Sequence, residues 1–393
     1  MNKTKALIQF FLLVGLVIVS SILSTRIWSE KPEKIQTPQS LRFEENMTIK
    51  EFGEKNNVPK QVLQEAFHLN SKQDLNKQLK DLNLSHDVIS KSVNTKLTIY
   101  AEHASKNWMK ILLKFSLWIS FLIIILNLLR KGKINAKTRK IFYLIAIIVF
   151  GVVLGSDPNP MGTIKDALVL LGSKGVIFAP RLIALLVFFL TVFVANKFIC
   201  AWGCQLGTLQ DLIFRLNRRS NDTKSIFKQY KIPFIVSNTI RIVFFILFTS
   251  IACIWAFDIV EIIDPFKVYK PEMLEIIGWI FLGIILIASL FIYRPWCHLL
   301  CPFGLAGWLI EKLSYFKINV DYKTCIECEL CTKSCPSNVM DSILKQDKVI
   351  PDCFSCGTCI EVCPTNSIQF LSKKRDKVPK GMFEKNQADK HQK

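Results

Sequence analysis

Residues 325–336, CIECELCTKSCP, and residues 353–364, CFSCGTCIEVCP, share one spacing of cysteines. Each follows C-x2-C-x2-C-x3-C-P, the arrangement by which bacterial ferredoxins ligate [4Fe–4S] clusters. Zinc sites usually separate two cysteine pairs by a longer gap or include histidine. No histidine lies between residues 299 and 390. The spacing therefore predicts two [4Fe–4S] clusters rather than zinc sites or a disulfide framework.

The same spacing assigns each cysteine to a cluster. In paired ferredoxin runs, three cysteines hold one cluster and the fourth, which precedes proline, reaches the neighbouring cluster. Neither run is then complete alone, and we expect residues 315–371 to fold as a C-terminal α+β domain of the two-cluster bacterial ferredoxin type. The expected ligands are Cys325, Cys328, Cys331 and Cys363 for the first cluster, and Cys353, Cys356, Cys359 and Cys335 for the second.

The rest of the chain is rich in apolar blocks. Hydrophobic residues make up 50% of the 393 residues, and the mean hydropathy is +0.30. Because a bilayer core of ~30 Å requires about 20 apolar residues in a helix, we expect a multi-pass α-helical membrane protein with about six spans. The first block follows Lys3 and Lys5 without an A-x-A site after it, which favours an uncleaved anchor over a cleaved signal peptide. The blocks are residues 6–23, 109–129, 141–155, 182–199, 233–257 and 274–293.

Charges in the loops predict the orientation. Loops 130–140 and 215–231 each carry six Lys and Arg residues, whereas loop 258–275 carries two Lys and five acidic residues. The positive-inside rule places the two basic loops in the cytoplasm, together with the cysteine runs, whose thiols stay reduced there. The expected location is the bacterial cytoplasmic membrane. Since much of the net charge of +20 lies in such loops, it does not indicate a nucleic-acid partner.

Five segments are expected along the chain. Between the first and second blocks, apolar residues recur at helical spacing from Phe52 to Leu69, with Pro59 near a helix start, so this part is predicted to be a small helical domain outside the cytoplasm. The segments are a membrane anchor (1–29), the extracytoplasmic helical domain (30–107), a membrane helical bundle (108–314), the cytoplasmic ferredoxin domain (315–371) and a basic tail (372–393) that is solvated or faces lipid.

The predicted bundle contains an internal repeat. The pattern C-x3-C-x2-G-x4-L-I-x-[RK]-L begins at Cys200, which defines the first motif, and again at Cys297, which defines the second. Each copy is preceded by a predicted span and, before that span, by an Asp-Pro pair that begins at Asp157 or at Asp264. Both copies run in the same direction, so we expect a parallel two-helix repeat about an axis along the membrane normal.

The two motifs supply four further candidate site residues. Cysteines at positions i and i+4 lie on one face of a helix, so two such pairs are expected to present their thiols toward one point at the inner membrane edge. These thiols are candidates for a further iron–sulfur cluster, for another metal, or for a dithiol–disulfide pair; packing of helix ends is the alternative. Cys253, in the middle of a predicted span, is interpreted as a packing residue. The four candidates are Cys200, Cys204, Cys297 and Cys301.

Over roughly residues 110–370 the layout resembles the membrane-bound polyferredoxin family typified by NapH-type quinol dehydrogenase subunits, with NosR-type and CcoG-type relatives. The shared pattern is two C-x3-C-P motifs at helix ends followed by two ferredoxin runs. The second motif matches it through Cys301 and Pro302, whereas Gln205 stands where the first motif would carry proline. The resemblance implies oxidation of a quinol in the membrane, with electrons leaving through the clusters or toward a partner protein.

We therefore predict a membrane-bound iron–sulfur protein that passes electrons between the quinone pool and a partner redox protein. If the chain is part of an enzyme, we expect it to be a quinol dehydrogenase subunit of an electron-transfer complex. An assembly factor that reduces or delivers metal to a respiratory enzyme and a membrane redox sensor are the alternatives. No histidine lies within a predicted span, which excludes a bis-histidine haem there. His298 is expected either to serve a quinol or cysteine site or to face water, and Arg241 to reach toward the membrane surface. No catalytic residue is assigned.

Overall fold

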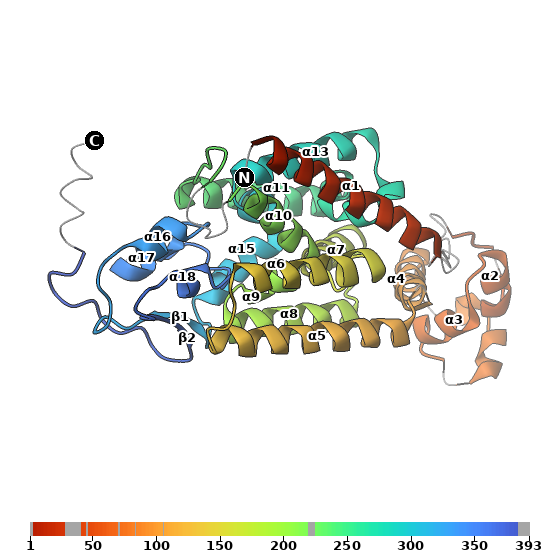
Figure 1. Cartoon of the computed structure of the whole chain (residues 1–393). Helices are drawn as coiled ribbons and strands as arrows, with labels where there is room; N and C mark the ends of the chain where they lie inside the picture. The colour runs from red at the N-terminus through yellow and green to blue at the C-terminus, as the bar shows by residue number, and fades with distance from the viewer. Residues whose placement is uncertain are drawn as a thin grey trace.

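The computed structural model describes residues 3–27, 41–44, 46–69, 71–82, 84–104, 106–218 and 225–383. The molecule is elongated, with a helical bundle in the middle, a small helical unit at one end and the cysteine-rich C-terminal region at the other (Figure 1). Residues 384–393 of the expected basic tail and residues 219–224 of the basic loop 215–231 lie outside the described residues.

Within these described residues, three helices are long and apolar enough to cross a membrane: Lys3–Arg26, Trp108–Arg130 and Phe234–Ile254. They correspond to the first, second and fifth predicted spans. The fourth and sixth coincide with the shorter apolar helices Ala179–Ala195 and Ile276–Phe291. The third lies in an α-helix that continues as a π-helix from residue 146 to residue 153. The mostly helical fold is confirmed, whereas insertion in a membrane and the count of six spans stay predictions.

The order of elements in the bundle is as follows. The N-terminal helix α1 lies along the outside of the bundle (Figure 1), and short helices interrupt the longer ones at both cysteine motifs. The elements are α1 (Lys3–Ile27), α5 (Trp108–Arg130), α6 (Ala136–Ile145), η3 (Ala146–Val153), α7 (Pro160–Lys174), α8 (Ala179–Ala195), α9 (Phe198–Trp202), α10 (Gln205–Leu216), α11 (Phe234–Ile254), α12 (Ile259–Ile262), η4 (Pro265–Tyr269), η5 (Pro271–Met273), α13 (Ile276–Phe291), α14 (Pro295–Leu299) and α15 (Pro302–Glu311).

Local sequence explains several helix ends. Asparagine side chains accept hydrogen bonds from backbone N–H groups that the first turn leaves without partners, which stabilises the helix start. Asn107 accepts from Lys110 at the start of α5, and Asn135 caps α6. Asn159 caps α7, whose first residue is Pro160. Gly175 ends α7 with a positive φ of 62°, a conformation that glycine adopts without the steric cost of a side chain.

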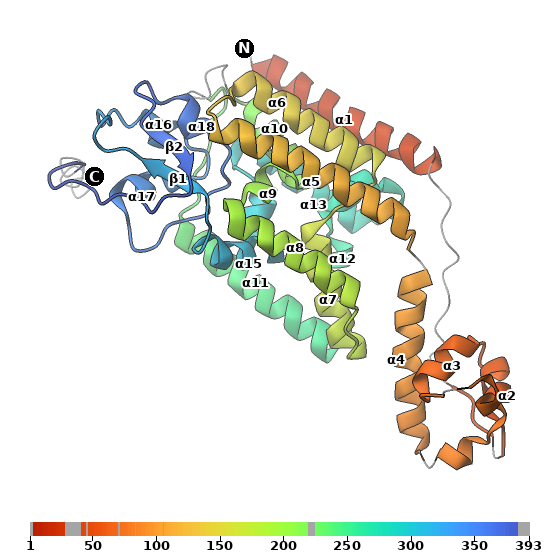
Figure 2. The ribbon, with the colours of Figure 1, turned by 90° about the horizontal axis from the view of Figure 1, so that it is seen from below.

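The small helical unit has its own core. It contains α2 (Ile49–Lys55), α3 (Lys60–Ala66), the 3-10 helices η1 (Lys72–Asn76) and η2 (Leu79–Leu82), and α4 (His86–Ala104). Phe52, Leu63 and Val93 are among the residues of a buried cluster that is separate from the core of the bundle. Helix α4 connects the unit to the bundle and leaves α2 and α3 far from it (Figure 2).

The C-terminal region is a compact α+β unit. Strand β1 (Lys317–Val320) pairs antiparallel with β2 (Ile368–Leu371), with Ile318 opposite Phe370. Three short helices, α16 (Leu330–Ser334), α17 (Val339–Lys345) and α18 (Thr358–Glu361), lie between the strands in sequence. Phe354 and Phe370 belong to the same buried cluster as the bundle, so this ferredoxin-like region packs directly on the bundle.

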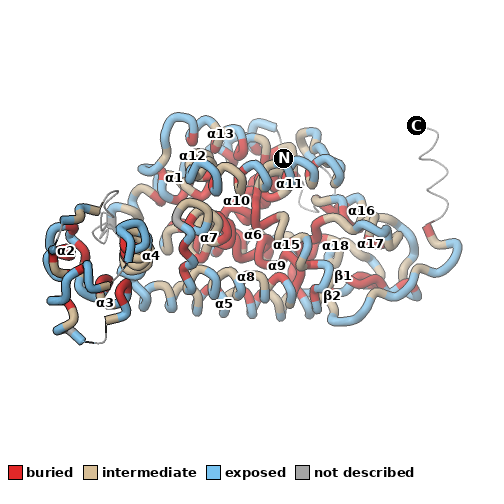
Figure 3. The backbone as a smooth tube through the Cα atoms, turned by 180° about the vertical axis from the view of Figure 1, so that it is seen from behind, coloured by how far each residue is buried: buried red, intermediate tan, exposed pale blue. Residues whose placement is uncertain are grey.

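Helix α10 is the centre of the bundle. Figure 3 shows buried backbone concentrated where α6, α9, α10 and α15 meet, and every residue of α10 from 205 to 215 is buried. A charged residue in this helix, Asp211, is buried as well and accepts four hydrogen bonds. Its donors are the hydroxyls of Tyr143 (2.9 Å) and Tyr293 (2.8 Å), Nη2 of Arg294 (2.7 Å) and Nε of Arg215 (2.7 Å).

This network predicts a large loss of stability on substitution of Asp211. Asp211→Ala would remove the carboxylate that pairs with two buried guanidinium groups and accepts from two buried hydroxyls, and the loss of one partner of a buried ion pair costs about 3–5 kcal/mol. Thermal unfolding of the detergent-solubilised protein measures the effect. Asp376→Ala removes an exposed ion pair with Lys373 and is the control, with an expected change within about 1 kcal/mol. Equal thermal unfolding midpoints for the Asp211→Ala and Asp376→Ala variants would contradict the stabilising role of the Asp211 network.

Candidate metal centres

The eight cysteines of the ferredoxin runs meet in two groups of four. Each group surrounds a small cavity of about 20 Å³. The first cavity collects three cysteines of the first run and the last cysteine of the second, and the second cavity shows the reverse pattern. The first is lined by Cys325, Cys328, Cys331 and Cys363, and the second by Cys335, Cys353, Cys356 and Cys359.

Matched backbone turns position the cysteines in both runs. Glu327 and Ser355 each lie two residues after the first cysteine of a run, and both have positive φ angles, 54° and 49°. Glu329 and Gly357, directly after the second cysteine, also have positive φ angles. Such left-handed residues reverse the chain within a few residues, which lets three thiols in a short loop face one cavity.

Burial and hydrogen bonds set the protonation of these thiols differently. Burial raises the pKa of Cys331 to about 12, and it also raises the pKa of Cys353 to about 12. At Cys363 burial acts in the same direction, but hydrogen bonds from the side chain and backbone of Thr365 outweigh it and lower the pKa. Metal ligation requires thiolates, so loading iron at the buried cysteines releases protons.

The C-x3-C motifs have a different local structure from the one predicted. Cys200 lies in the short helix α9, and Cys204 caps the N-terminus of α10. Cys297 lies in α14, and Cys301 stands at the N-cap position of α15. The prediction that each pair occupies one helical face is wrong, because one helix ends and the next begins between the two cysteines. In the second motif Pro302, which has no N–H to donate, begins the next helix.

The four motif thiols nevertheless converge. All four side chains are buried. Burial raises the pKa of the Cys200 thiol, and the other three cysteines are near enough to raise it further. Among the described residues, no group of three or more His, Cys, Asp or Glu side chains lies close enough to hold a single metal ion. A cubane cluster takes each thiolate at a different iron atom, so its ligands need not converge on one point.

A buried cation beside each motif donates hydrogen bonds to the other motif. Lys197 and Arg294 each lie three residues before the first cysteine of their own motif, and both are buried. Arg294 donates to the carbonyl oxygens of Cys200 and, at 3.2 Å, of Ala201 in the first motif. Lys197 donates to the carbonyl oxygen of Gly304 in the second, at 2.6 Å. Each motif therefore supplies a donor that satisfies buried carbonyl groups of the other.

Glycine is required where each second helix passes the first cysteine of its motif. A Cβ atom on Gly207 would lie 2.5 Å from the carbonyl oxygen of Cys200, and one on Gly304 would lie 2.7 Å from that of Cys297. Both separations are far shorter than van der Waals contact. The shared glycine of the two motifs thus permits the close turn that brings the second cysteine back toward the first.

One buried carboxylate links the motifs to the second ferredoxin run. Asp352 directly precedes Cys353 and is fully buried. It forms ion pairs with Lys197 and with Nη1 of Arg241, the latter at 2.9 Å, and lies 3.7 Å from Nδ1 of His298. Burial acts to raise the pKa of Asp352, but the positive charges of Lys197 and Arg241 outweigh this effect and lower the pKa to about 2. The carboxylate is therefore ionised at neutral pH.

These contacts correct two predictions and decide between two alternatives for a third residue. Arg241 is fully buried and bound to Asp352, so it does not reach toward the membrane surface. The side chain of His298 is 12% exposed and packs on Phe354, so it lies beside the cysteine motifs rather than in water. Cys253 is exposed on α11, so the packing interpretation is wrong.

Sequence reasoning missed the charged residues of the site. Asp211, Asp352, Lys197 and Arg294 were not singled out, although two signals were present. A cation occurs at the same position, three residues before the first cysteine, in both motifs, and an aspartate stands directly before the second ferredoxin run. Neither signal identifies the partner, because the ion pairs join residues as far apart as 155 positions.

Comparison with known proteins supports the iron–sulfur interpretation. Residues 317–380 match a family model described as a 4Fe-4S dicluster domain. Residues 177–221 and 275–320 each match a second model, described as a 4Fe-4S binding domain, and these segments contain the first and second motifs.

One relative is the "Putative electron transport protein YccM" of Escherichia coli strain K12, which is 29% identical over 170 residues, or 42% of this chain. The chain spans about half of that protein's length (48%). Two proteins of Methanocaldococcus jannaschii, the uncharacterized MJ0749 and MJ0750, are 24% and 25% identical over 58% and 45% of the chain, and 82% and 72% of their own lengths are covered. No solved structure matches. These matches support an iron–sulfur protein that is similar to a putative electron transport protein.

Proposed function

We propose that this chain is a membrane-bound electron-transfer protein that connects the quinone pool to a partner redox protein through iron–sulfur clusters. The observation that carries the proposal is the pair of four-cysteine cavities, each completed by a cysteine from the other run. The proposed ligands are the four cysteines that line each cavity. When bound, the two [4Fe–4S] clusters supply carriers that accept and release one electron at a time.

The four motif thiols are proposed to hold a further iron–sulfur cluster. They are buried, they come from two motifs that are fixed to each other by the reciprocal contacts of these cations, and both motifs lie within matches to a 4Fe-4S binding model. The matching order of elements, α8–α9–α10 and α13–α14–α15, supports the proposal that the motifs are copies of one repeat.

The chain holds this site against the loop of the second cluster. Nε1 of Trp202, in the first motif, donates to the carbonyl oxygen of Ser355 at 3.2 Å. Nε of Arg139 donates to the carbonyl oxygen of Cys356 at 2.9 Å, and Nη2 of Arg215 donates to the hydroxyl of Thr358 at 3.2 Å. These bonds, together with the ion pairs of Asp352, fix both ends of the loop, which favours direct electron transfer between the two sites.

The proposed orientation places the ferredoxin-like region in the cytoplasm. The support is the excess of Lys and Arg in loop 130–140, which lies at the same end of the bundle as the cysteine runs: Arg139 pairs with Glu361 at 2.9 Å. The small helical unit at the opposite end then lies outside the cytoplasm.

Iron analysis tests the crossed ligand assignment. Cys325→Ala and Cys363→Ala remove ligands of the same proposed cluster, so each single variant and the double variant are expected to lose about four iron atoms per chain. Cys325→Ala combined with Cys335→Ala disrupts both clusters and is expected to lose about eight. The measurement is iron content of anaerobically purified protein, with electron paramagnetic resonance of the remaining cluster. A double variant of Cys325 and Cys363 that loses about eight iron atoms would exclude the crossed arrangement.

Substitution of Asp352 tests the link between the two sites. Asp352→Asn keeps the shape of the side chain but removes the charge that holds Lys197 and Arg241. The amide hydrogens of residues 353–357 are expected to exchange with solvent about tenfold faster, because the loop loses its buried anchor. Asp347→Asn changes an exposed carboxylate in the same segment and is the control. Hydrogen-exchange mass spectrometry makes the comparison, and equal exchange in both variants would remove the anchoring role.

Reduction by quinol tests the quinone part of the proposal. In anaerobic protein, addition of a menaquinol or ubiquinol analogue is expected to reduce at least one iron–sulfur centre, seen as a change in the visible and electron paramagnetic resonance spectra. Dithionite provides the fully reduced reference. Clusters that dithionite reduces but that neither quinols nor quinones change at any ratio would contradict the quinone connection and leave the ferredoxin function standing.

A further inference from the structure

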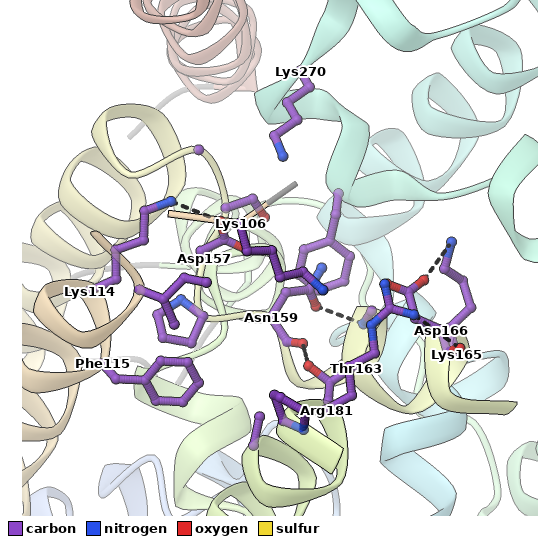
Figure 4. A pocket seen from close by; sticks show the side chains of 18 of the residues that line it. Lys106, Lys114, Phe115, Asp157, Asn159, Thr163, Lys165, Asp166, Arg181 and Lys270 are labelled. Atoms are coloured by element: carbon purple, nitrogen blue, oxygen red, sulfur yellow. Dashed lines mark hydrogen bonds and ion pairs between the residues drawn. The ribbon is translucent and has the colours of Figure 1, made fainter. Parts of the chain in front are cut away.

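A large cavity lies at the end of the bundle away from the ferredoxin-like region. Its volume is about 560 Å³, within the range of about 300–1,000 Å³ that is usual for small-molecule sites. We call it the polar chamber, because charged side chains from α5, α7 and α8 surround it (Figure 4). Both Asp-Pro pairs of the repeat contribute to it, through Asp157, Pro158 and Asp264. The chamber is thus built from corresponding parts of the two copies.

A second cavity adjoins the polar chamber. Its volume is about 260 Å³, and apolar side chains of α7, α8 and α11, including Leu168, Leu185 and Phe245, form nearly all of its wall. We call it the apolar chamber. Phe178 and Arg181 line both chambers. A molecule that fills the two together therefore has a polar head and an apolar tail.

Three cations of the polar chamber have carboxylate partners. Nζ of Lys114 lies 2.8 Å from Asp157, and Nζ of Lys165 lies 2.5 Å from Glu261. Arg181 pairs with a carboxylate of α4 at 3.0 Å. Lys270 also lines the chamber, and no carboxylate pairs with it in the part of the chain that the structure describes. Its ammonium group can donate a hydrogen bond to an oxygen of a bound head group.

Two short routes connect the polar chamber to the first cysteine motif. Nε2 of Gln205 donates to the carbonyl oxygen of Pro158 in the chamber wall, at 3.0 Å, and the next residue toward the N-terminus is Cys204. On the other side, Phe188 lines the chamber and packs edge-on against Trp118 with ring centroids 5.5 Å apart. Nε1 of Trp118 donates to the carbonyl oxygen of the residue before Cys204, at 2.9 Å. A bound lipid that takes no part in electron transfer would not require either of these connections to the cysteine motif.

Gln205 distinguishes the first motif from the second. The second motif carries Pro302 at the corresponding position, and a proline has no side-chain amide. Gln205 is fully buried, and its backbone carbonyl oxygen accepts a hydrogen bond from the hydroxyl of Tyr269 at 3.0 Å. Only the first motif can therefore hold the wall of the chamber through a hydrogen bond of this kind.

We propose that the two chambers form one binding site for an isoprenoid-tailed quinol or quinone, with the head in the polar chamber and the tail in the apolar chamber, and that Gln205 positions the chamber wall against the first cysteine motif. The proposal rests on the electron-transfer function proposed above. Oxidation of one quinol gives one quinone, two electrons and two protons. Iron–sulfur clusters held by the proposed cysteine ligands would accept the two electrons, one at each of two oxidised centres, and the protons would pass to carboxylates of the polar chamber and then to water.

Asp264 is placed to take such a proton. It lines the chamber and is nearly fully buried. Burial raises the pKa of its carboxyl to about 6, although a hydrogen bond from the N–H of Phe266 and the charge of Lys165 act in the opposite direction. Glu261 and Lys267 are the other charged groups that act on it. A carboxyl with this pKa can both accept and release a proton close to neutral pH.

Neighbouring residues on α8 give a matched test of the tail site. Leu185 lines the apolar chamber, whereas Leu186 is exposed and does not. Leu185→Trp fills the chamber and is expected to weaken binding of a decyl-tailed quinone analogue by about tenfold or more, since each buried methylene contributes about 0.8 kcal/mol. It should change binding of a tailless analogue by less than about threefold, and Leu186→Trp should change neither. Isothermal titration of the full-length protein measures binding, and a photoreactive decyl analogue should label peptides of α7 and α8.

Gln205→Leu tests the positioning role. The loss of a buried hydrogen bond of about 1 kcal/mol predicts cluster reduction by quinol about fivefold slower, with unchanged reduction by dithionite and photolabelling within about twofold of the unaltered protein. Gln205→Asn keeps the amide on a shorter side chain and should recover part of the rate. Equal quinol rates in Gln205→Leu and the unaltered protein would remove this role.

The outcomes separate the two proposals. If quinol does not reduce the clusters of the unaltered protein, the quinone part of the proposed function fails. If quinol reduces them but Leu185→Trp binds and reacts as the unaltered protein does, the function stands and the chamber assignment fails. Displacement of the photoreactive analogue by phosphatidylglycerol vesicles, but not by phosphatidylcholine vesicles, would identify an anionic-lipid site and overturn the assignment.

Discussion

The rest of the structure depends on a reciprocal contact between the two C-x3-C motifs, in which a buried cation beside each motif donates hydrogen bonds to backbone carbonyls of the other. Arg294 satisfies carbonyl groups of the first motif, and Lys197 satisfies one of the second. Buried carbonyl and charged groups are costly without partners, so neither motif is stable apart from the other. Each cation also needs a carboxylate, and these are Asp211 inside the bundle and Asp352 at the edge of the ferredoxin-like region. The reciprocal contact therefore fixes the four motif thiols together and sets the place at which the ferredoxin-like region binds.

This arrangement places the proposed sites in order along the molecule. The polar chamber lies at one end of the bundle, the motif thiols lie beneath its wall, and the two four-cysteine cavities follow at the other end. The bundle and the ferredoxin-like region share one hydrophobic core, which keeps the separations along this line fixed. Rigid, water-poor surroundings suit electron transfer, because little reorganisation accompanies the movement of charge.

The sequence predicted the parts of this structure that depend on short-range spacing. The two cysteine runs identify which thiols meet, since the C-x2-C-x2-C-x3-C-P spacing fixes the turn geometry; their role as ligands stays a prediction. Apolar blocks located the three long helices. The sequence did not predict that the helix ends between Cys200 and Cys204, because periodicity alone does not distinguish one continuous helix from two consecutive ones. The sequence also did not predict the pairing of Arg241 with Asp352, because these residues lie 111 positions apart and meet only in the folded chain. Buried ion pairs of this kind have no local pattern.

The central claim is that the motif thiols and the two ferredoxin-type sites form one chain of iron–sulfur centres. The most direct test is the iron and acid-labile sulfide content of anaerobically purified protein, compared with that of the Cys200→Ala, Cys297→Ala double variant. Three four-iron centres predict about 12 iron atoms per chain, falling to about eight in the variant. A content of about eight iron atoms in both proteins would contradict the account, since the motif thiols would then hold no cluster.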